Sequence, residues 1–185
     1  MRTMLATLAV LMLAGCASRM SPDEAPAPGA MPAPGETLPA PPWQAAPLGS
    51  AAVPPVLLAA WRAAENRQGC APIAFATLAA GAGATPRAAT FSGGWGVAWD
   101  RPALRSAFGV AGAGVLAADA SYDAWPFERR WSDGSTAGYG PEGGTGPNQL
   151  AYLRIAGQEC LYNVWSRLGR EHLESLLDAI RFVAQ

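Results

Sequence analysis

The feature that most restricts how this 185-residue chain can fold is a stretch rich in proline and alanine, residues 19–55. Segments such as Pro32-Ala33-Pro34-Gly35 and Pro41-Pro42 lack an N–H donor at each proline and offer little apolar surface to bury. The stretch predicts an extended tether. We expect Trp43 to be exposed rather than in contact with the domain or a membrane. Residues 56–185 remain as one domain, long enough for a single core.

The N-terminus has the organisation of a secretory signal. Arg2 is the only charge before Cys16, and the apolar run from Met4 to Leu13 is shorter than the roughly 20 residues of a spanning helix. Leu13-Ala14-Gly15-Cys16 resembles the lipobox of bacterial lipoproteins. The resemblance implies that residues 1–15 are removed as a signal peptide and that Cys16 is lipidated. The alternatives are an ordinary secretory peptide with a chance cysteine and an uncleaved, buried apolar segment.

The same resemblance implies a location. Several acyl chains on Cys16 would give a firm anchor in a membrane of the cell envelope. In enteric bacteria an aspartate after the lipidated cysteine favours retention in the inner membrane, and this chain has Ala17 there. We therefore expect attachment to the outer membrane, facing the periplasm, with residues 16–55 holding the domain away from the lipid.

Charge excludes several classes of function. The chain has no lysine, which excludes P-loop nucleotide binding, Ser-Lys nucleophiles and Schiff-base chemistry. Arginines and acidic residues balance within residues 56–185, whereas a protein that binds nucleic acid would show a basic surplus. No nucleic-acid partner is expected.

The cysteine count predicts one disulfide. With Cys16 lipidated, Cys70 and Cys160 remain as an even pair in an exported protein, so we expect them to be bonded to each other. Two separate buried thiols are the alternative. A catalytic thiol is disfavoured because the nearby sequence supplies no base.

Residue periodicity predicts an α+β domain, an antiparallel sheet packed by an N-terminal and a C-terminal helix. Helical spacing of apolar residues marks residues 56–67 and 170–183. Alternation marks strands, and Asp133-Gly134 and Gly157-Gln158 mark hairpin turns, the second of type II′. The expected strands are 72–78, 88–100, 107–116, 150–156 and 159–166. The glycine-rich residues 136–147 are expected to form a loop, and the small-residue faces of strands 88–100 and 107–116 are expected to lie against a helix.

The order of strand, glycine turn, strand and amphipathic helix over about the last 35 residues resembles the end of PsbP/Mog1-like domains, several of which are exported lipoproteins. The resemblance bears on the fold and implies no functional residue.

The sequence shows no recognisable catalytic set, cofactor site or metal site. Gly138-Tyr139-Gly140-Pro141-Glu142-Gly143 matches a dinucleotide motif only in its glycines, since Pro141 opposes the helix that the motif needs. His172, the only histidine, lacks partners at metal-ligand spacing and is expected to be half-buried on the last helix.

Function is predicted only by class. Arg129, Arg130 and Trp131 combine residue types that are favoured at interaction surfaces and are the candidate partner surface, although a plain buried hairpin is the favoured interpretation. The leading hypothesis is a non-enzymatic, membrane-anchored binding or accessory module for an envelope protein or a small ligand. The alternatives are an envelope hydrolase with paired carboxylates and a structural envelope protein.

Overall fold

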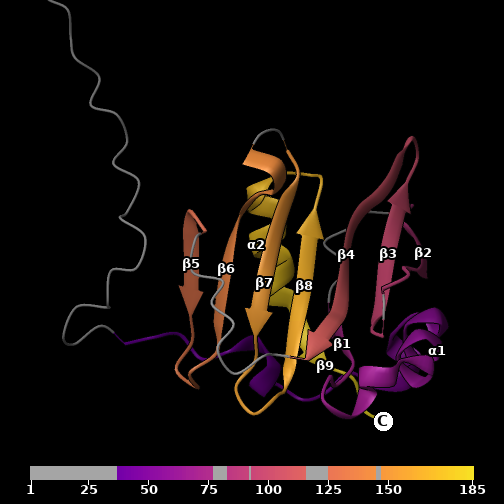
Figure 1. The fold of residues 1–185 in the computed structure, drawn as a ribbon, viewed down its shortest axis with the longest axis horizontal. Helices are drawn as coiled ribbons and strands as arrows, with labels where there is room; N and C mark the ends of the chain where they lie inside the picture. The colour runs from indigo at the N-terminus through magenta and orange to yellow at the C-terminus, as the bar shows by residue number, and fades with distance from the viewer. Residues whose placement is uncertain (1–36, 77–82, 92, 116–124, 145–146) are drawn as a thin grey trace, which may run out of the picture.

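A computed structural model describes residues 37–76, 83–91, 93–115, 125–144 and 147–185. The described chain is mostly antiparallel sheet, with one helix on its N-terminal side and one near its C-terminus (Figure 1). The lipobox and Cys16 lie outside the described residues. The elements are α1 (Pro55–Ala63), β1 (Ile73–Phe75), β2 (Thr85–Ala88), β3 (Trp95–Arg101), β4 (Leu104–Val115), β5 (Phe127–Arg130), β6 (Thr136–Pro141), β7 (Gln149–Arg154), β8 (Cys160–Ser166), α2 (Arg170–Ala179) and β9 (Ile180–Phe182), with short 3-10 turns at Pro42–Gln44, Ser50–Ala52, Glu65–Gln68 and Glu142–Gly144.

One seven-stranded sheet organises the fold, in the order β2-β3-β4-β8-β7-β6-β5. Every neighbouring pair is antiparallel. Three hairpins, β3–β4, β5–β6 and β7–β8, supply half of the pairings between neighbouring strands. The long-range pairing of β4 with β8 joins the two halves of the sheet, so residues 50 positions apart come side by side: Gly112 lies opposite Tyr162.

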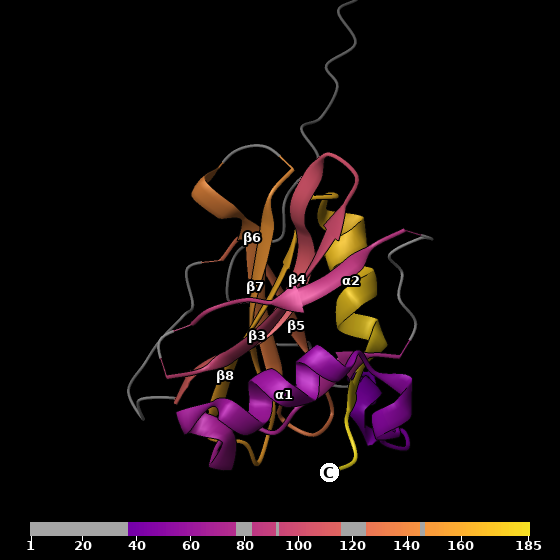
Figure 2. The ribbon, with the colours of Figure 1, turned by 90° about the vertical axis from the view of Figure 1, so that its right-hand side faces the viewer.

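Both helices pack on this sheet. α2 lies along one face, against β7 and β8, and α1 lies against β2 and β3 (Figures 1 and 2). We call the face towards α2 the inner face. Its centre is aromatic, because the rings of Trp99 and Phe108 stack with centroids 5.3 Å apart. The helices add buried leucines to the same core: Leu57, Leu58, Leu173, Leu176 and Leu177.

The last helix is shorter than its apolar stripe predicted. The sequence favoured a helix over residues 170–183, but α2 ends at Ala179 and the chain becomes extended at Ile180. β9 then pairs with β1, with Ile73 opposite Phe182. Pairing with β1 gives backbone N–H and C=O groups of residues 180–182 hydrogen-bond partners. The last part of the apolar stripe is therefore a strand and not a helix.

The folded part of the chain begins before Val56, where the sequence analysis placed its boundary. Trp43 is buried, and its Nε1 donates a hydrogen bond of 3.0 Å to Asp133 Oδ2. Its ring lies edge-on to Trp131, with centroids 4.9 Å apart. Further along, Leu48 bridges Val183. The expectation of an exposed Trp43 is therefore wrong: residues that looked like tether complete the core.

The glycine-rich stretch after Asp133-Gly134 is also more regular than predicted. The turn forms the β5–β6 hairpin, but residues 136–141 form strand β6 and not a loop. Glycine favours loops locally, yet here pairing with β5 and β7 on either side holds the segment extended. The β7–β8 hairpin is confirmed, although its turn differs: Gly157, with φ 80°, is the second central residue, whereas type II′ needs glycine first.

Side chains, and not a helix, cover the small-residue faces of β3 and β4. On the outer face, a Cβ added to Gly109 would lie 2.1 Å from the Trp165 ring, and one added to Gly96 would lie 2.6 Å from the Phe91 ring. The expectation of a helix there is wrong. The glycines instead admit two aromatic rings onto the backbone.

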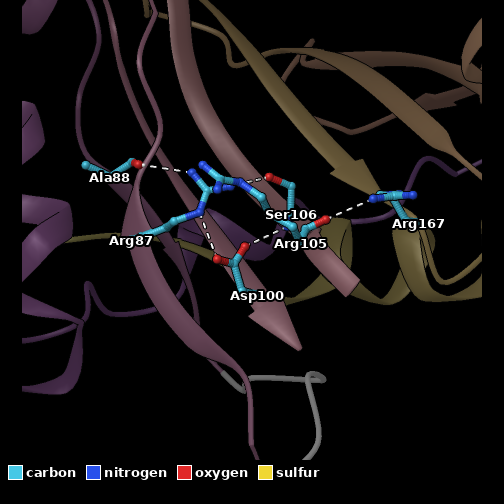
Figure 3. A network of polar contacts seen from close by, with 6 residues as sticks. All are labelled: Arg87, Ala88, Asp100, Arg105, Ser106 and Arg167. Carbon is cyan, nitrogen blue, oxygen red and sulfur yellow. Dashed lines mark hydrogen bonds and ion pairs between the residues drawn. The ribbon is translucent and has the colours of Figure 1, made fainter. Parts of the chain in front are cut away.

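A polar network closes the outer edge of the sheet at the β3–β4 hairpin (Figure 3). Asp100 accepts hydrogen bonds from the Ser106 N–H at 2.6 Å and from Arg87 Nε at 2.9 Å. Arg87 also donates to Ser106 Oγ. The Ser106 hydrogen bond, and then the Arg87 hydrogen bond, lower the pKa of Asp100 below 3.8.

Replacing Asp100 by asparagine should therefore reduce the loss of thermal stability that occurs when the pH is lowered. Because the folded state lowers the pKa of Asp100, its contribution is present above pH 3.8 and is lost as pH falls through the lowered pKa. We expect Asp100→Asn to lower the melting temperature at pH 7 and to approach the wild type at pH 3. Thermal unfolding followed by circular dichroism tests this, with the exposed Glu159→Gln as control. A difference that stays constant with pH would contradict it.

Candidate functional site

Cys70 and Cys160 form the predicted disulfide. Their Cα atoms are 4.8 Å apart, and both residues are fully buried. The bond joins the segment that follows α1 to the first residue of β8. Around it, Asn66 Nδ2 donates to the Gly112 carbonyl at 2.9 Å. The disulfide therefore fixes the N-terminal helix segment to the middle of the sheet.

The predicted surface of Arg129, Arg130 and Trp131 does not form as one patch. Trp131 is only 2% exposed, beneath Trp43. Successive residues of a strand point to opposite faces, so the two arginines diverge. Arg129 pairs with Asp178 of α2 at 2.6 Å, whereas Arg130 pairs with Glu128 at 2.8 Å. Trp131 instead fits the buried-hairpin interpretation, because its ring lies in the core.

The start of α2 borders an open hollow of about 480 Å³. We call it the α2 hollow. In Figure 1 the start of α2 lies behind the upper ends of β6 and β7. Strand ends and the chain that enters the helix supply its walls. The lining residues are Phe127, Pro141, Gln149, Leu168, Gly169, Arg170 and Glu171.

The first turn of α2 lines this hollow through Arg170 and Glu171 and has no side-chain cap. Gly169 precedes the helix with φ 98°, a conformation suited to glycine, and no side chain caps the helix. The first helical hydrogen bond runs from the Leu173 N–H to the Gly169 carbonyl. The N–H groups of Arg170 and Glu171 therefore have no partner within the helix. Together they carry the partial positive charge of a helix N-terminus.

Gln149 places a buried amide at the same hollow. It starts β7 on the inner face, where its alternating neighbours Ala151 and Leu153 are buried. Gln149 is 7% exposed, and its Oε1 has no hydrogen-bond partner among the described residues. A buried amide without a partner is costly, on the order of 1–3 kcal/mol. A bound molecule that supplied a hydrogen bond would remove part of that cost.

Arg170 and Phe127 form one wall of the hollow. The Arg170 guanidinium lies 4.6 Å from the centre of the Phe127 ring, and that ring stacks on Tyr139 at 5.6 Å. The Tyr139 hydroxyl donates to Glu174 Oε1 at 2.9 Å, and Arg170 Nε lies 3.7 Å from the same oxygen. Burial, and then the hydrogen bond to Glu174, raise the pKa of Tyr139. The wall thus combines an aromatic surface with one guanidinium.

Among the described lining residues of the hollow, only Glu171 carries a carboxylate, so these residues do not supply the carboxylate pair that a hydrolase would need. His172 is directed elsewhere: its Nδ1 is 2.9 Å from Ser166 Oγ and its ring packs on Phe108. Over the described ranges, no group of three or more histidine, cysteine or acidic side chains could hold a metal ion.

Sequence reasoning did not find this hollow. Gly169 before a helix and a glutamine at an inward position of β7 were both visible signals. They indicate a common site only when the ends of β6 and β7 lie beside the start of α2. That arrangement follows from strand pairing across the sheet and not from neighbouring residues.

Comparison with known proteins gave no match to a family model, a curated protein or a solved structure. The resemblance to PsbP/Mog1-like domains stays a prediction. None of the helices in the described part of the chain is long and apolar enough to cross a membrane.

Proposed function

We propose that this chain is a lipid-anchored binding module of the bacterial cell envelope, without catalytic activity, and that its ligand site is the α2 hollow. One observation supports the binding role: the start of α2, which has no side-chain cap, and the buried amide of Gln149 line the same hollow, beside apolar side chains. A site of this kind is mostly apolar with a few placed polar groups.

The lipobox carries the location. Lipidation at Cys16 would tether the domain, and Ala17 favours the outer membrane with the domain in the periplasm. Because residues from Pro39 onward contact the domain, the tether that remains is residues 17–38. At ~3.1 Å per residue, it would span on the order of 70 Å when extended. We also propose the α+β class for the domain, with both helices packed on the sheet.

Replacing Cys16 by serine tests the anchor. We expect the wild-type chain to sediment with membranes and to carry a lipid mass on the peptide that begins at Cys16. The Cys16→Ser chain should lack that mass, because serine has no thiol to alkylate. Fractionation with mass spectrometry of the N-terminal peptide provides both readouts, and Cys70→Ala/Cys160→Ala is the control for general loss of cysteine. An N-terminal peptide of unmodified mass in the wild type would overturn the anchor.

A further inference from the structure

We propose that the α2 hollow binds a small organic carboxylate with an apolar body. The inference rests on the proposed binding role and adds the chemical class of the ligand. Three features of the hollow converge on this class: donors at one end, an amide in the middle and an apolar wall.

The donors favour an anion. The helix has no side-chain cap, so the N–H groups of Arg170 and Glu171 are the donors at the hollow, and a helix N-terminus is a ready binding site for a carboxylate or phosphate oxygen. Arg170 stands beside them, with its side chain 49% exposed. An arginine can bind a carboxylate through two parallel N–H donors.

Gln149 supplies the second, independent indication of a ligand. Its side chain is more than nine-tenths buried, lines the hollow and has no hydrogen bond to any described residue. A primary amide can present either a donor or an acceptor by turning about its last bond. Towards a carboxylate it would present its NH₂ group, in line with the donors of α2.

The surrounding charges favour a monoanion. Glu171 lines the hollow, and Glu174 lies 3.7 Å from Arg170. A dianion such as phosphate would lie beside the Glu171 carboxylate with only the Arg170 guanidinium to balance its charge, and that guanidinium already lies near Glu174. The ring of Phe127, with Leu168 and Pro141, offers apolar contact that an inorganic ion would not use. The combination therefore selects one negative charge joined to an apolar group.

Benzoate, benzamide and inorganic phosphate provide the test. Each is titrated into the full chain in non-ionic detergent, with binding followed through backbone and Gln149 side-chain amide shifts in NMR spectra. We expect benzoate to bind about tenfold more tightly than benzamide, its neutral analogue of the same shape, and more tightly than phosphate. Equal affinities for benzoate and benzamide, or shifts away from the first turn of α2, would overturn the inference.

Substitutions locate the effect. Arg170→Gln and Gln149→Leu should each weaken benzoate binding about tenfold, and Glu171→Gln should tighten it, because a competing carboxylate is removed. Arg62→Gln, the same change on an exposed part of α1, should leave the affinity unchanged. Since a gain in affinity cannot come from misfolding, Glu171→Gln keeps the test valid if Gln149→Leu fails to fold. Unchanged affinity in Arg170→Gln would overturn the inference.

The anchor and the ligand class can fail separately. If benzoate fails to bind while the wild-type chain still carries the lipid on Cys16, the carboxylate ligand is wrong and the anchored module stands. If benzoate binds but Cys16 is unmodified, the ligand class stands and the lipid anchor is wrong.

Discussion

Replacing Cys70 and Cys160 together by alanine is expected to lower the free energy of unfolding by about 4 to 5 kcal/mol. The bond spans a sequence separation of 90 residues, so the unfolded chain gains much conformational freedom when it is removed. Alanine is the suitable replacement because both positions are fully buried and alanine, unlike serine, adds no hydroxyl group to the interior. Urea unfolding of the oxidised full chain, carrying Cys16→Ser in both forms, measures the difference.

Reduction provides a matched control for this prediction. The Cys16→Ser chain treated with dithiothreitol should unfold at nearly the same urea concentration as the double alanine variant, and reductant should not affect the variant. A reduced chain as stable as the oxidised chain would show that the disulfide contributes nothing to stability.

Replacing Trp43 by alanine is expected to cost about 3 to 5 kcal/mol of stability, a magnitude typical of a large aromatic side chain removed from a core. Trp43 is 5% exposed, packs on Trp131 and donates to Asp133. Its loss would leave a cavity and a carboxylate with one hydrogen bond fewer. The substitution would also remove one of the contacts that hold residues 39–48 against the rest of the domain.

Trp43→Phe separates packing from hydrogen bonding. Phenylalanine keeps most of the ring contact with Trp131 and lacks the Nε1 donor to the Asp133 carboxylate, so its cost should be about 1.5 to 3 kcal/mol. Urea unfolding of the two variants beside the wild type makes the comparison. An alanine variant with wild-type stability would mean that the segment before α1 adds nothing to the fold, as the tether interpretation held.

Predictions from neighbouring residues succeeded where local chemistry dominates. The pair of cysteines, in a chain expected to be exported, predicted the disulfide, and Asp133-Gly134 predicted the β5–β6 turn. The stripe of Leu173, Leu176 and Leu177 predicted the buried side of α2. In each case a few residues carry the physical cause, whether a bond, a turn conformation or a helical period.

Predictions failed where distant partners compete with local preference. Trp43 looked exposed among prolines, yet the β5–β6 turn brings Trp131 and Asp133 beneath it. The glycine-rich residues 136–141 looked like a loop, yet β5 and β7 hold them as strand. Arg129 and Arg130 were candidates for one surface, but strand alternation directs their side chains to opposite faces.

The sequence by itself determined the lipobox pattern, the disulfide pair, the positions of two hairpins and the apolar side of the last helix. Tertiary structure alone decided where the folded part begins, how α2 ends and that Gln149 faces the start of α2. The physical reason is separation along the chain. Neighbouring residues determine local conformational preferences. The α2 hollow, by contrast, forms only because strand pairing brings distant segments of the chain together.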